Sequence, residues 1–202
     1  MTGIVRRCLP LVLVASVGLV SACSLGTSTG TPLATATAAS TATEEVWTML
    51  EQRPLQLPTL APGSPCPTAH GHPISPSFGL GLGGGPAYPV GLGSTGVLQY
   101  APPANFDSHD WGGMKVLWAV DTPHYSGVVL IRGHQLDGPN ELRFETGDVP
   151  PTELRVTPFP GTPEGWTGQP SYTRVRAPGC YAYQIDGLTF SQHIIFEAVA
   201  TP

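Results

Sequence analysis

The second half of the chain is dominated by short segments in which apolar and polar residues alternate. In the clearest of these, the apolar positions of residues 181–185 fall on one face of an expected strand. Asp186-Gly187 has the residue types of a tight hairpin turn, and residues 188–196 then resume the alternation. The pattern therefore predicts a β-hairpin close to the C-terminus.

Further strands are predicted upstream, where β-branched and aromatic residues lie between Gly- or Pro-containing turns: 114–120, 128–131, 141–144, 153–157 and 172–176. Short strands at this spacing are typical of a β-sandwich or a barrel. The 25 Gly and 23 Pro among 202 residues exclude a helical bundle, because both residue types break helices. We therefore expect an all-β domain over residues 74–202.

One helical pattern precedes this domain. Val46, Met49 and Leu50 recur at the three- and four-residue spacing of a helix face, and Pro54 ends the pattern. The segment 44–51 is therefore predicted to be a short helix capped by Thr43 and packed on the edge of the domain. The alternative is a helix that docks on a partner.

The first 22 residues have the features of a secretory signal peptide. Arg6 and Arg7 precede an apolar run at 9–20, which is shorter than the roughly 20 residues that span a membrane. The sequence Val20-Ser21-Ala22-Cys23 resembles the lipobox of bacterial lipoproteins. This resemblance implies that the chain is cleaved before Cys23 and that Cys23 carries lipid, including palmitate. Several acyl chains would hold the protein on the extracytoplasmic side of the cell membrane.

Between the lipobox and the helix, residues 24–43 are Thr, Ala, Ser and Gly with little else, and they carry no charged or aromatic side chain until Glu44. Such a segment has nothing to bury, so we expect a disordered tether. The expected organisation comprises a signal peptide, a lipidated Cys with its tether, a helix with a Pro-rich arm, and a β-domain: 1–22, 23–43, 44–73 and 74–202.

The cysteines indicate one disulfide. If Cys8 is removed with the signal peptide and Cys23 is lipidated, only Cys66 and Cys180 remain. Two thiols in an exported domain are expected to pair, and the bridge would pin the Pro-rich arm to a C-terminal strand. The alternative is a Cys nucleophile with a His base.

The segment around Cys180 also carries a resemblance to a known fold family. Residues 177–187, in which Pro178-Gly179-Cys180-Tyr181 enter a strand, resemble the last hairpin of bacterial immunoglobulin-like domains. This implies an immunoglobulin-like β-sandwich preceded by a signal peptide, a disordered Thr/Ala tether and one short helix. The whole chain is similar to a group of bacterial surface lipoproteins with a Pro-Cys-Pro segment after a tether. That resemblance implies no activity.

Charge and glycine content exclude two kinds of ligand. The net charge is −5 and Lys115 is the single lysine, so we expect no nucleic acid partner. The segment 78–96 holds a Gly79-x-Gly81-x-x-Gly84 spacing of the dinucleotide-binding type. Two prolines follow instead of a helix that would receive the phosphates, so the segment is interpreted as a Gly-rich surface loop. No cofactor is expected.

Weak candidates for a metal site lie in two loops. His70 and His72 are spaced to share a metal, and Asp107 and His109 are further ligand types in the next loop. Their alternative interpretation is that of solvated loop residues. If they converged, the protein would be an exported hydrolase or a metal-dependent enzyme.

Aromatic residues in turns suggest a contact surface instead. Trp111, Trp166 and Tyr125 lie beside turn residues and are candidates for ligand contact, although packing within the domain is the simpler explanation. The sequence therefore favours a membrane-anchored, non-catalytic binding or structural module. Its expected partners are membrane lipid through Cys23 and either another envelope protein or a wall polymer.

Overall fold

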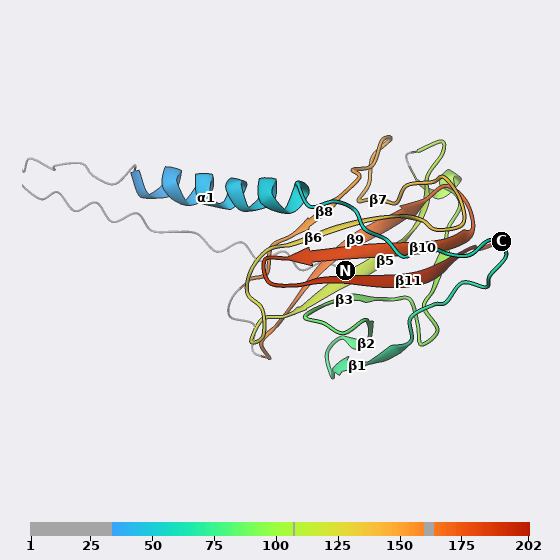
Figure 1. The fold of residues 1–202 in the computed structure, drawn as a ribbon, viewed down its shortest axis with the longest axis horizontal. Helices are drawn as coiled ribbons and strands as arrows, with labels where there is room; N and C mark the ends of the chain where they lie inside the picture. The colour runs from blue at the N-terminus through green and yellow to red at the C-terminus, as the bar shows by residue number, and fades with distance from the viewer. Residues whose placement is uncertain (1–33, 107, 160–163) are drawn as a thin grey trace, which may run out of the picture.

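The computed structural model describes residues 34–106, 108–159 and 164–202, with side chains from Thr43 onward. These residues form helix α1 (Ala34–Glu51), a 3₁₀ turn η1 (Pro103–Asn105) and two β-sheets (Figure 1). The first sheet contains, in spatial order, β1 (Gly71–Ser75), β2 (Gly79–Leu82), β3 (Ala87–Val90), β5 (Gly112–Asp121), β9 (Trp166–Val175) and β7 (Arg143–Phe144). The second contains β4 (Val97–Tyr100), β11 (Ser191–Ala200), β10 (Gly179–Gly187), β6 (Val129–Gln135) and β8 (Leu154–Val156).

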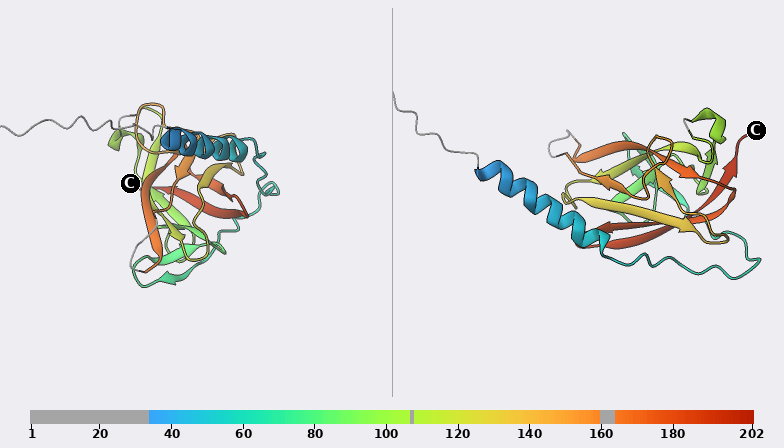
Figure 2. Two further views of the ribbon diagram at one scale, coloured as in Figure 1. Left: turned by 90° about the vertical axis from the view of Figure 1, so that its left-hand side faces the viewer. Right: turned by 90° about the horizontal axis from the view of Figure 1, so that it is seen from above.

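The two sheets pack face to face around one main core (Figure 2). Alternate residues of β5 and of β10 point inward, and the rings of Trp118 and Tyr183 meet edge to face with centroids 5.1 Å apart. Both side chains are almost fully buried, which is the arrangement that period-two alternation in strands produces. The prediction of an all-β sandwich is confirmed.

A side-chain hydrogen bond joins the start of β10 to the residues just before it. The Tyr181 hydroxyl donates to the carbonyl of Ala177 at 2.8 Å, across the corner that leads from β9 into β10. A tyrosine that bonds back across this corner is a feature of immunoglobulin-like sandwiches. The strand that was predicted to begin at Pro178-Gly179 is β10.

The turn between β10 and β11 differs from the predicted one. Asp186 pairs with Ser191 inside the ladder, and the turn is made by the four residues from Gly187 to Phe190, closed by the Gly187 N–H to Phe190 carbonyl bond. The Asp186 side chain is fully buried and bonds to Arg132 at 2.8 Å. The ion pair with Arg132 keeps this carboxylate inside the strand. Its contribution to stability is larger than the local preference of Asp-Gly for a turn.

Helix α1 begins at Ala34, so residues 34–43, predicted as part of the tether, are helical. Alanine is the strongest helix former, and its frequency in this stretch explains the extension. The buried face also differs from the predicted one, because Trp47 and Leu50 pack against Leu130 of β6 whereas Met49 is 47% exposed. Trp47 is held there by the Arg155 guanidinium, which lies 5.2 Å above its ring centroid.

The Pro-rich arm after α1 runs along the outer face of β10. Gln184 fixes it near its start, because its amide oxygen accepts from the Gln56 N–H and its amide nitrogen donates to the Pro54 carbonyl. The Cys66–Cys180 disulfide fixes it further along, with Cα atoms 5.3 Å apart, and this confirms the predicted pairing. The arm therefore covers polar side chains of β10 that would otherwise face solvent.

The segment 78–96 was predicted to be a surface loop, and this is wrong in part. It contains β2 and β3, and Tyr88 of β3 pairs with Ala119 of β5. Glycine at position 81 is needed here, since a Cβ would lie 2.9 Å from Tyr88 and Ile74 side-chain atoms. Its glycines thus permit close packing of short strands, and the first sheet begins at Gly71.

The predicted signal peptide, Cys23 and residues 24–33 of the predicted tether lie outside the described residues. Within the described residues, no helix has the length and apolar character to cross a membrane.

Candidate functional site

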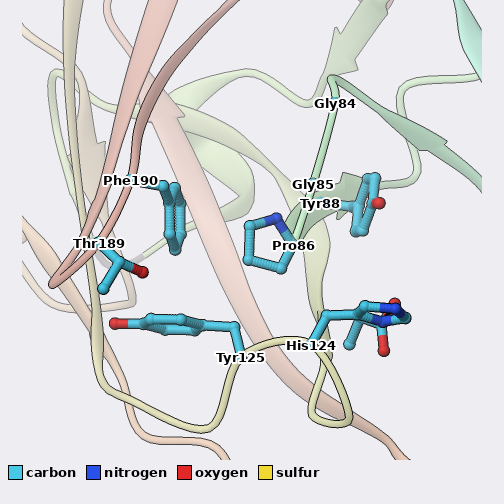
Figure 3. A pocket seen from close by; sticks show the side chains of 9 residues that line it. Gly84, Gly85, Pro86, Tyr88, His124, Tyr125, Thr189 and Phe190 are labelled. Atoms are coloured by element: carbon cyan, nitrogen blue, oxygen red, sulfur yellow. Dashed lines mark hydrogen bonds and ion pairs between the residues drawn. The ribbon is translucent and has the colours of Figure 1, made fainter.

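A pocket opens at one end of the sandwich, where three chain segments meet (Figure 3). These segments are the β2–β3 turn, the β5–β6 loop and the β10–β11 turn. The cavity has a volume of about 440 Å³, and its main lining side chains are those of Pro86, Tyr88, Asp121, His124, Tyr125 and Phe190. It therefore draws on both sheets at the point where the core ends.

The aromatic wall of the pocket is held rigidly. The Tyr125 hydroxyl donates to the Val128 carbonyl at 2.7 Å and accepts from the Leu188 N–H at 2.9 Å. Its ring meets Phe190 edge to face with centroids 4.9 Å apart, and burial raises the pKa of Tyr125 above its ordinary value. Tyr125 thus ties the β5–β6 loop to the β10–β11 turn.

Arg53, just after α1, fixes the same turn from outside. Its guanidinium donates to the Gly187 carbonyl at 2.7 Å, to the Leu188 carbonyl at 3.2 Å and to the Phe190 carbonyl at 3.5 Å. The turn that supplies Phe190 to the pocket is therefore bonded to the segment that joins α1 to the arm.

The polar side of the pocket is an aspartate–histidine pair. His124 Nδ1 lies 2.8 Å from an Asp121 carboxylate oxygen, and the Asp121 N–H donates to the Pro86 carbonyl at 2.9 Å. The Asp121 side chain is 17% exposed and that of His124 is 78% exposed. Nδ1 therefore carries the hydrogen toward the carboxylate, and Nε2 faces solvent at the rim.

Tyr88 forms the wall opposite Phe190, with Pro86 between them (Figure 3). The Trp166 ring packs against Tyr88, with ring centroids 5.7 Å apart. Burial, and secondarily the negative charge of Asp121, raises the pKa of Tyr88, so its hydroxyl stays protonated.

The three predicted contact residues do not form one surface. Tyr125 lines the pocket, and Trp166 supports it without being one of its main walls. Trp111 lies at the opposite end of β5, where it is buried and contacts the guanidinium groups of Arg143 and Arg176, at 5.4 and 4.3 Å from its ring centroid. The interpretation of domain packing therefore holds for Trp111.

The predicted metal ligands are also separated. His70 and His72 are exposed at and beside β1, and the strand register runs from His72 across β2 and β3 to Leu117 of β5. His109 lies in the turn before the other end of β5, eight positions along the chain from Leu117. Asp107 lies outside the described residues. Among the residues that the structure describes, no three His, Cys, Asp or Glu side chains gather as a metal site.

Sequence reasoning missed most of the pocket. Pro86, Tyr88, Asp121, His124 and Phe190 were not singled out as site residues, because they come from three turns and the strand residues beside them, which only the sheet pairing brings together. The signal that was available is Asp121-x-x-His124, which follows directly on the clear strand pattern of 114–120. An acid and a histidine three residues apart in a turn are close enough to form an ion pair with each other.

The groups that line the pocket are of several chemical kinds. The pocket offers apolar ring faces, one carboxylate, one imidazole and hydroxyl groups, which are the groups that orient a small organic ligand. No protein family model, curated protein or solved structure matches the chain in comparisons with known proteins.

Proposed function

We propose that this protein is a non-catalytic binding module that a lipid on Cys23 holds at the extracytoplasmic face of the cell membrane. The single observation that carries the binding role is the aromatic-walled pocket of about 440 Å³ at the end of the sandwich. Its volume lies within the roughly 300–1,000 Å³ of small-molecule and peptide-side-chain sites. Its walls are already fixed by hydrogen bonds before any ligand is present.

The path of the chain supports a role close to the anchor. Helix α1 projects beyond the end of the sandwich that carries the pocket (Figures 1 and 2). Its 18 residues give it a length of roughly 27 Å. A lipid on Cys23 would therefore place the pocket on the membrane side of the domain. The expected partner is an envelope component in the layer directly above the bilayer.

Binding to detergent-washed envelope material tests this function. Full-length protein in detergent should sediment with the washed material, and His124→Ala and Asp121→Asn should each weaken this binding about tenfold. The matched controls are His109→Ala and Asp110→Asn, which change the same residue types at the far end of the sandwich. Binding that is unchanged in the pocket variants, or that is weakened equally in the controls, would contradict the proposal.

The alternative of an exported hydrolase or metal-dependent enzyme makes a different prediction. Purified protein would then hold close to one equivalent of a transition metal, and His70→Ala would remove it. Metal analysis by mass spectrometry decides between the two, because the binding module requires no metal.

A further inference from the structure

The charges around the pocket restrict the ligand. The Asp121 carboxylate, with its Oδ2 atom bonded to His124, would repel an anion. The Arg53 guanidinium lies close enough to Tyr125 that its charge partly offsets the rise that burial causes in the pKa of Tyr125, so a positive charge also borders this side of the pocket. An uncharged ligand avoids repulsion by Asp121 and by Arg53.

The hydrogen-bonding groups favour a ligand with several hydroxyls. Asp121 Oδ1 only accepts, whereas the hydroxyls of Tyr88 and Thr189 both donate and accept. His124 Nε2 accepts when Nδ1 carries the hydrogen toward Asp121, and it donates when the ring is protonated. A polyhydroxylated ligand supplies donors and acceptors in the same alternation. A peptide backbone, by contrast, presents them in a fixed, widely spaced order.

The apolar faces complete the match. Tyr88, Pro86 and Phe190 are half-buried, and each presents part of a ring to the cavity (Figure 3). Sugar rings have one face of C–H groups that packs on aromatic rings, with hydroxyls around the edge. The combination of ring faces inside and hydrogen-bonding groups at the rim suits that amphipathic shape.

Hydrogen bonds between its segments hold the pocket in one shape, which favours the binding of ligands that make few contacts. Tyr125 joins two of its segments, and Arg53 holds the β10–β11 turn through three carbonyls. Gln192 of β11 accepts from the Gly84 N–H and donates to the Ala87 carbonyl, which joins the β2–β3 turn to the opposite sheet. A preorganised site loses little conformational entropy on binding.

We infer that this pocket binds a sugar residue of a neutral glycan, with Asp121 and His124 bonding its hydroxyls and the Tyr88, Pro86 and Phe190 rings packing on its C–H face. This inference rests on the proposed function, because it names the ligand class of the same pocket. A short stretch of a wall or envelope polysaccharide at the membrane side of the domain is the ligand that fits the position of α1.

The test is saturation-transfer NMR on full-length protein in detergent. The probes are maltohexaose, mannohexaose, cellohexaose, and envelope polysaccharide digested exhaustively with protease. At least one should bind saturably below 10 mM, and Asp121→Asn and His124→Ala should each weaken binding about tenfold through a lost hydrogen bond to a charged or aromatic partner. The controls His109→Ala and Asp110→Asn should bind within about twofold of the parent.

A proline decapeptide is titrated in parallel, since aromatic-lined grooves also bind polyproline segments. If no glycan binds up to 10 mM, the sugar inference is wrong. If the peptide alone binds, and the pocket variants abolish that binding, the sugar inference fails while the binding module stands. If pocket variants change neither glycan binding nor sedimentation with envelope material, both are overturned.

Discussion

The buried ion pair between Arg132 and Asp186 allows the strongest prediction about stability. Asp186 is fully buried and accepts from Arg132 at 2.8 Å, from Gln184 at 2.9 Å and from Ser191 at 2.7 Å. The same arginine donates to the Arg53 carbonyl at 2.8 Å, at the end of α1. One carboxylate therefore organises the β10–β11 ladder and the docking of the helix.

Replacing this carboxylate leaves a guanidinium group with little solvent and no counter-charge. The Arg132 side chain is only 14% exposed, so Asp186→Ala should lower the free energy of unfolding by about 3–5 kcal/mol. At roughly 2–4 °C per kcal/mol for a domain of this size, the midpoint of thermal unfolding should fall by about 10 °C. Urea unfolding followed by tryptophan fluorescence gives the free energy directly.

The control is Glu44→Ala, which removes an acid that bonds to Arg155 at 3.4 Å on the surface. The Glu44 side chain is 68% exposed, and such pairs contribute little, so the change should stay below about 1 kcal/mol. The double variant Arg132→Met/Asp186→Leu should recover part of the loss, because it removes both charges together. Equal losses for Asp186→Ala and Glu44→Ala would refute the reasoning.

Three further predictions concern the disulfide, alkaline stability and the anchor. Replacing Cys66 and Cys180 together with Ala should cost about 2–5 kcal/mol in urea, because the bridge closes a long loop; an unchanged midpoint, or unchanged gel mobility of the parent on reduction, would contradict this. Burial raises the pKa of Tyr181 to about 12, so the unfolded chain loses this proton first and stability should fall by up to about 3 kcal/mol between pH 10 and pH 12. Tyr181→Phe should flatten that decline in urea titrations from pH 8 to pH 12, and an unaltered slope would exclude Tyr181 as its source. Cys23→Ser should move the protein from the detergent phase to the aqueous phase of a Triton X-114 partition, and unchanged partitioning would argue against lipidation.

The strands and the disulfide were predictable because each depends on information local to the chain. Alternation within β5 and β10 follows from which face of a strand is buried, and this needs no knowledge of the partner strand. Cys66 and Cys180 were the two thiols left after the N-terminal cysteines were assigned, so their pairing needed a count and not a distance. The prediction of an Asp186-Gly187 turn was wrong because a turn preference depends only on residues adjacent in the chain. The ion pair that holds Asp186 inside the ladder is made with Arg132 of the neighbouring strand β6.

The sequence by itself determined the all-β class, the approximate positions along the chain of most of the later strands, the helix before the domain and the pairing of Cys66 with Cys180. Only the tertiary structure decided where a site lies. Tyr88 of β3, Asp121 at the end of β5 and Phe190 of the β10–β11 turn are far apart along the chain. They meet because β3 pairs with β5 in one sheet, β10 pairs with β11 in the other, and the core ends between them. The alternation within a strand depends only on which of its faces is buried, so it can be read from the sequence of that strand. A pocket depends on the distances between residues of different strands and turns, and those distances are set only when the two sheets pack.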